Sequence, residues 1–183
     1  MPGKLSAWCY RMATPPVLIA AVLIFILFIV LVLPEMAGKL TDLTGVGVSP
    51  DTSFIYSSAD LYAMAEAYGA EGRAYYIRSR YTFDLIFPAV YLVFLAAVIS
   101  RLFRFLPADD PKRFINLLPF GGAIFDLFEN SAASLVMYRY PLLTPFAALL
   151  APVFSFLKWV FIGLSFIGLF LGLALALVRF IRK

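Results

Sequence analysis

The chain has 183 residues, of which 63% are apolar and 14% charged, and its net charge is +4. Soluble chains are about half apolar and about a quarter charged, so the composition excludes an ordinary soluble domain. The absence of histidine excludes Ser-His-Asp triads and zinc-hydrolase signatures, and we expect no metal and no cofactor. The single cysteine, Cys9, excludes an internal disulfide.

Four apolar segments are long enough to cross a bilayer, which takes about 20 residues per helix. The first covers about residues 15–34, entered through Pro15-Pro16 and closed by Pro34. A signal peptide is the rival interpretation. The run is longer than a usual signal core and no clean A-x-A site follows, so we expect an uncleaved helix.

The second and third segments cover about residues 81–101 and 113–138. The second closes at Ser100-Arg101. The start of the third is well marked, because Asp110 can cap the first turn and Pro111 suits the first helical position.

The fourth segment is part of an apolar stretch that begins at Leu142 and is too long for one perpendicular crossing. As one straight helix it would extend about 55 Å. We expect Pro145 and Pro152 to break its start. The span is then about 152–179, and residues 141–152 form a short helix or hairpin at the membrane edge.

These segments predict an all-α fold class: a polytopic membrane protein with a four-transmembrane-helix bundle, forming a single membrane domain over residues 1–183. Four spans put both termini on one side, which most basic residues outside the spans then share, so the positive-inside rule makes the N and C termini cytoplasmic. The basic charge therefore indicates a lipid bilayer as partner and no nucleic acid. We expect a bacterial inner (plasma) membrane.

The outer segment, residues 35–80, is expected to be partly helical. "GVGVSPD" is a turn region, Ser58 can cap a following helix, and Gly69 can end it. A second short helix should then lead into the second span. The first helix carries one apolar face, made of Leu61, Met64, Ala65 and Tyr68.

The stretch "IFDLFEN" places polar side chains inside the third span. Asp126, Glu129 and Asn130 are spaced i, i+3 and i+4, which puts them on one helical face. An ionised carboxylate that faces lipid costs several kcal/mol, so this face must turn into the bundle. We expect it to meet Asp84 of the second span and Lys158 of the fourth, in the outer half of the membrane.

These residues form the candidate site. Asp126 and Glu129 would be the primary ligands of a small cationic or lipid-like molecule, Asn130 would orient it, Asp84 would gate, and Lys158 would switch charge. Three residues at the outer rim complete the ligand-binding set: Arg78, Arg80 and Tyr81.

Each feature also has a purely structural interpretation. The acids and Lys158 can form a polar knot that holds the helices together, and Asp84 can pair with Arg80 at a helix start. The rim arginines and Tyr81 can be interfacial anchors. Gly168 and Gly172 are typical of close helix packing.

Three functions follow from the sequence. Binding or transport of a small cationic or lipid-like ligand is the first. A membrane enzyme acting on a lipid is the second, in which the paired carboxylates and the lysine do acid–base chemistry. A structural or accessory subunit is the third, with the first membrane span, about residues 15–34, as the surface for a homodimer or a membrane partner.

Overall fold

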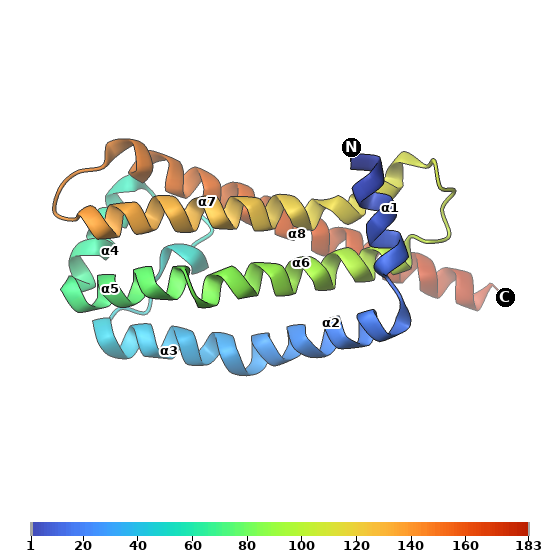
Figure 1. The fold of residues 1–183 in the computed structure, drawn as a ribbon, viewed down its shortest axis with the longest axis horizontal. Helices are drawn as coiled ribbons and strands as arrows, with labels where there is room; N and C mark the ends of the chain where they lie inside the picture. The colour runs from blue at the N-terminus through green and yellow to red at the C-terminus, as the bar shows by residue number, and fades with distance from the viewer. Residues whose placement is uncertain (1, 183) are drawn as a thin grey trace.

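The computed structural model describes residues 2–182, and every regular element in that range is a helix. Within this range, three helices are long and apolar enough to cross a membrane: Pro15–Thr44, Gly69–Leu102 and Pro145–Ile181. Most helices share one long axis, α1 lies across one end, and both chain ends lie toward that end (Figure 1). The all-α class and the presence of membrane-type helices are therefore confirmed.

In chain order the elements are α1 (Pro2–Met12), α2 (Pro15–Leu27), the π-helical turn η1 (Phe28–Val32), α3 (Leu33–Thr44), the 3₁₀ turn η2 (Pro50–Thr52), α4 (Ser58–Ala67), α5 (Gly69–Arg80), α6 (Phe83–Leu102), the 3₁₀ segment η3 (Pro111–Leu117), α7 (Leu118–Arg139) and α8 (Pro145–Ile181).

The first membrane helix does not end at Pro34, so the predicted boundary is wrong. The helix continues as α3 to Thr44 and stops at Gly45, whose φ of 68° is left-handed. The π turn η1 ends two residues before Pro34, and the N–H of Leu33 donates to the carbonyl of Phe28. Proline has no N–H, and a π turn absorbs the resulting mismatch without ending the helix.

The fourth apolar stretch is one continuous helix, so the predicted break is also wrong. α8 runs 37 residues, with Pro145 in its first turn and Pro152 inside it. A proline in the first turn lacks only an N–H that would have no partner there. An interior proline in an apolar helix is tolerated where neighbouring helices hold the chain, and α7 packs along α8 more extensively than any other pair of elements.

The outer segment is helical, as predicted, with a small shift in its cap. Ser57, not Ser58, caps α4 and forms a reciprocal capping box with Asp60. The Ser57 hydroxyl also donates to the Asp60 carboxylate, and this hydrogen bond lowers the pKa of Asp60. The predicted apolar face is buried apart from the half-buried Met64, and Gly69 takes a left-handed φ of 62° between α4 and α5. α4 packs on α7 and α8.

The predicted third span begins later than residue 113. Asp110 does cap the segment, since its carboxylate accepts from the N–H of Lys112 at 2.8 Å, but η3 is a 3₁₀ helix and α7 starts at Leu118. Asn116, at the end of η3, bonds the hydroxyl of Ser100 on α6 and the backbone and hydroxyl of Ser6 on α1. These buried hydrogen bonds hold α1 across the end of the bundle.

Gly172 marks a close approach of α8 to α6, as the "GLFLG" spacing predicts. A Cβ at Gly172 would lie 2.9 Å from Leu102 Cβ and 2.9 Å from Phe103 Cε2, whereas one at Gly163 would meet nothing within 4 Å. We expect Gly172→Ala to lower the free energy of unfolding by about 1–3 kcal/mol through overpacking. Gly163→Ala should raise it by about 0.5–1 kcal/mol, because alanine is the better helix former. Denaturation in mixed detergent–dodecyl sulfate micelles measures both, and equal signs would contradict the assigned contact.

Candidate functional site

Five elements bring charged side chains together at the end of the bundle away from the termini. Six residues form what we call the polar cluster: Asp51 of η2, Arg80 of α5, Asp84 of α6, Asp126 and Glu129 of α7, and Lys158 of α8. The residues other than Asp51 are at most 9% exposed. The face predicted from the i, i+3, i+4 spacing does turn inward, and Asn130 on the same face is 3% exposed.

Lys158 is the cation at the centre of the polar cluster. Its Nζ lies 2.5 Å from Glu129 Oε2 and 3.8 Å from Asp126 Oδ1. It also donates to the main-chain carbonyl of Asp51 at 3.4 Å. Glu129 is fully buried and Lys158 is 3% exposed, so this pair is shielded from water. Coulombic attraction is stronger in such an interior than in water.

Tyrosine hydroxyls satisfy the remaining oxygens of the two α7 acids. Tyr56 donates to Glu129 Oε1 at 3.3 Å, Tyr91 donates to Asp126 Oδ2 at 3.1 Å, and the Asn130 amide donates to Asp126 Oδ1 at 3.3 Å. Burial, followed by the charge of Glu129, raises the pKa of Tyr56 far above its usual value. The Tyr56 hydroxyl therefore stays protonated and remains a donor.

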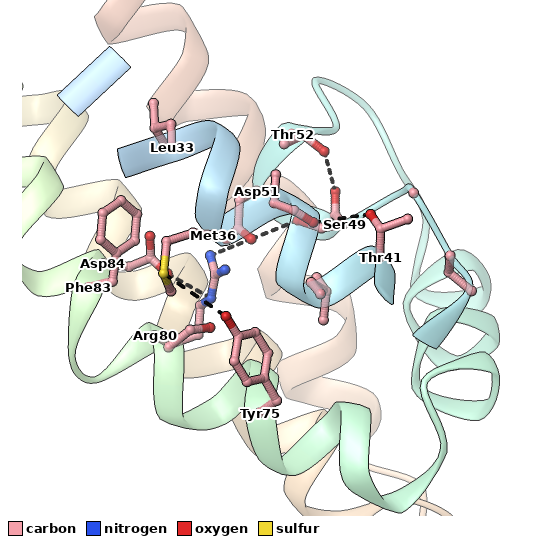
Figure 2. A pocket seen from close by; sticks show the side chains of 15 residues that line it. Leu33, Met36, Thr41, Ser49, Asp51, Thr52, Tyr75, Arg80, Phe83 and Asp84 are labelled. Atoms are coloured by element: carbon pink, nitrogen blue, oxygen red, sulfur yellow. Dashed lines mark hydrogen bonds and ion pairs between the residues drawn. The ribbon is translucent and has the colours of Figure 1, made fainter. Parts of the chain in front are cut away.

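Arg80 of α5 links η2 to α6. Figure 2 shows its guanidinium reaching from α5 between Asp51 and Asp84. Nε lies 2.9 Å from Asp84 Oδ2, and Nη1 pairs with Asp51 Oδ2. The guanidinium also lies 4.5 Å from the centre of the Tyr76 ring, a cation–π contact.

The polar cluster has more acids than bases. Four carboxyl groups share two cationic side chains, Arg80 and Lys158. Uncompensated charge inside a protein is costly, so protons or a bound cation must balance the excess. This imbalance separates the polar cluster from a simple ion pair that holds two helices together.

Two cavities meet at the Arg80 ion pairs. The outer cavity, of about 100 Å³, lies between α3 and α5 and is drawn in Figure 2. The inner cavity, of about 270 Å³, extends from the polar cluster along α2, α6 and α8. Both are lined by Asp51, Arg80 and Asp84; only the inner one also reaches Asp126 and Lys158.

The inner cavity is polar at one end and apolar along its length. Besides the charged residues and Thr52, it is lined by Phe25, Ile29, Leu33, Phe87, Tyr91, Trp159, Ile162 and Phe166. Within residues 2–182, the buried Nε1 of Trp159 and Oδ1 of Asp51 have no hydrogen-bond partner. Both residues belong to the wall of the inner cavity, but these two atoms are themselves enclosed by the protein.

Asn130 contacts the polar cluster through Asp126, whereas two other predicted site residues lie apart from it. Arg78 is exposed, because it stands two positions before Arg80 and therefore on another side of α5, where it stacks on Tyr75. Tyr81 occupies the turn between α5 and α6 and is 52% exposed. Both positions fit the interfacial-anchor interpretation better than a ligand role.

The structure adds three residues that sequence reasoning missed: Asp51, Tyr56 and Tyr91. Tyr91 had a local signal, since it lies seven residues after Asp84 and so on the same face of α6. Asp51 and Tyr56 had none. They lie in the irregular segment between α3 and α4, and only the folding of that segment onto the bundle brings them to the acids.

No protein-family model, curated protein or solved structure matches this chain, so the buried polar cluster and the inner cavity are the features from which its function has to be inferred.

Proposed function

We propose that this chain is a four-span membrane protein whose inner cavity binds a small amphipathic cation, such as an amine with an apolar tail. One observation supports the proposal: a single cavity combines an acid-rich polar end with long apolar and aromatic walls. The binding function is preferred over a lipid enzyme or an accessory subunit because this cavity is a specific feature of the structure.

α7 is the proposed fourth span. Its 22 residues would extend about 33 Å, enough to cross a hydrocarbon core of about 30 Å. Its acids face the other helices, while its outward surface is apolar. The exposed side chains include Ile124, Leu127, Phe128 and Leu135. With α2, α6 and α8 this gives an even number of crossings and, by the positive-inside rule, cytoplasmic termini.

The chemistry of the inner cavity favours an organic cation over a bare metal ion. A positive head group near Asp126 and Asp84 would offset the excess of carboxylates. Phe87 and Tyr91 beside these acids add aromatic faces, which attract ammonium groups. An apolar tail would lie along Ile162 and Phe166 on α8.

The ligand would enter sideways from the membrane. α2 packs mainly on α6. The inner cavity is bordered by Phe25 and Ile29 on the first membrane helix and by Ile162 and Phe166 on α8. A molecule dissolved in the outer half of the bilayer can therefore reach the acids between these two helices.

Tryptophan fluorescence tests the proposal directly. The chain has two tryptophans, and Trp8→Phe leaves Trp159 as a single reporter in the wall of the inner cavity. Decyltrimethylammonium titrated into this protein in dodecyl maltoside should shift the Trp159 emission saturably, and neutral 1-decanol should not. Asp126→Asn keeps the 2.5 Å pair of Lys158 with Glu129 and should weaken binding of the cation about tenfold or more.

Asp42→Asn is the matched control, since Asp42 is an exposed acid on α3 outside the inner cavity. It should bind the cation like the parent. Equal responses to decyltrimethylammonium and 1-decanol, or unchanged cation binding in a folded Asp126→Asn protein, would sink the proposal. Thermal unfolding of the same samples establishes that each variant is folded.

A further inference from the structure

A third cavity lies at the opposite end of the molecule, beneath α1. Its volume is about 410 Å³, within the range of about 300–1,000 Å³ typical of small-molecule sites. α1 lies across the bundle end here, beside the connection between α6 and α7 (Figure 1). The helix exposes Leu5, Trp8 and Met12, as a helix at a membrane interface does.

Three arginines from three different segments line this cavity: Arg11 of α1, Arg104 after α6, and Arg113 of η3. Tyr10 positions two of them, Arg104 and Arg113. The guanidinium of Arg104 donates to the Tyr10 carbonyl, and that of Arg113 lies 3.6 Å from the centre of the Tyr10 ring. Tyr10 is 4% exposed, and its hydroxyl donates to the Arg113 carbonyl at 3.3 Å. Burial raises the pKa of Tyr10, so the hydroxyl stays neutral.

The three guanidinium charges are not paired with carboxylates in the described part of the protein. Within residues 2–182, none of the ion pairs includes Arg11, Arg104 or Arg113. Asp109 and Asp110 also line the cavity, but the Asp110 carboxylate is turned to the backbone N–H of Lys112. The cavity thus keeps a net positive charge, with planar donors suited to phosphate oxygens.

We infer that the cavity beneath α1 binds a phosphoryl group, carried by an anionic phospholipid of the cytoplasmic leaflet. The apolar side chains exposed on α1 would lie among the acyl chains, next to the arginines that hold the head group. Basic cavities at the cytoplasmic ends of membrane helices are suited to anionic head groups. The inference rests on the membrane placement proposed above and is independent of the cation in the inner cavity.

Lipid-dependent thermal unfolding tests this inference on the full-length protein. Delipidated protein in dodecyl maltoside is titrated with dioleoylphosphatidylglycerol or with dioleoylphosphatidylcholine. The anionic lipid should raise Tm saturably and the zwitterionic lipid should not. Arg113→Gln and Arg11→Gln should each raise the half-saturating lipid concentration about five- to tenfold. Arg11 has an exposed side chain, so Arg11→Gln keeps the test decisive if Arg113→Gln fails to fold.

Arg101→Gln is the control, because Arg101 is an exposed arginine of α6 outside this cavity. Its lipid response should equal that of the parent. Glycerol 1-phosphate and inorganic phosphate form the third arm: saturable protection by either, lost in Arg113→Gln, would support the phosphoryl site and assign it to a soluble ligand. Equal protection by both lipids, or equal losses in Arg101→Gln and Arg11→Gln, would overturn the inference.

Discussion

Replacing Lys158 by methionine is expected to lower the free energy of unfolding by about 3–5 kcal/mol. Lys158 is the nearest cation to the fully buried Glu129, at 2.5 Å, and it also faces Asp126 at 3.8 Å. Methionine fills most of the same space but leaves both carboxyl groups without a cation. Removing one partner of a buried pair is costly because the other charge stays desolvated.

A double-mutant cycle separates this mechanism from lost packing. Lys158→Met combined with Glu129→Gln should recover much of the loss, since glutamine can still accept from Tyr56 without carrying a charge. The parent, the two single variants and the double variant are all unfolded by dodecyl sulfate in mixed micelles. Additive losses from the two substitutions would show that the ion pair contributes nothing, and the polar cluster would then need another account.

Replacing Arg80 by methionine should lower the free energy of unfolding by about 3 kcal/mol or more. Arg80 is the cation shared by Asp51 and Asp84, and its side chain is 10% exposed, so solvent screens these pairs only weakly. Its loss leaves two carboxylates facing each other and releases η2 from the bundle. Limited proteolysis should therefore cut residues 45–57 faster in Arg80→Met than in the parent.

Arg78→Met is the matched control on the same helix. Arg78 is exposed and its guanidinium stacks on the Tyr75 ring, at 5.7 Å, so its replacement should change the unfolding free energy by less than about 0.5 kcal/mol. Similar losses in both variants would contradict the assignment of Arg80, and not Arg78, to the polar cluster.

Because the acids are in excess, the stability of the polar cluster and the binding proposed for it depend on different residues. Lys158 with Glu129, and Arg80 with Asp51, are paired contacts that hold α5, α7, α8 and η2 together. Asp126 contributes less to these pairs but lines the inner cavity. Neutralising Asp126 should therefore affect a bound cation more than the fold, whereas removing either base should affect the fold first.

The sequence by itself determined the features that depend on local periodicity and composition. Apolar runs predicted membrane-type helices, and the i, i+3, i+4 spacing predicted that Asp126, Glu129 and Asn130 share an inward face, because helical geometry alone relates such positions. The pairing of that face with Lys158 was predicted by the cost of a carboxylate in lipid. Helix ends near prolines were predicted less well, since Pro34 and Pro152 lie within continuous helices.

Only the tertiary structure decided which further residues complete the polar cluster. Asp51 lies 29 residues before Arg80 in the chain and joins it only when the segment between α3 and α4 folds onto the bundle. No local pattern encodes such a contact, because it depends on how an irregular segment packs against several helices at once. The inner cavity has the same origin: its shape is set by the separation of α2 from α8, which is a property of the packed bundle and of no single helix.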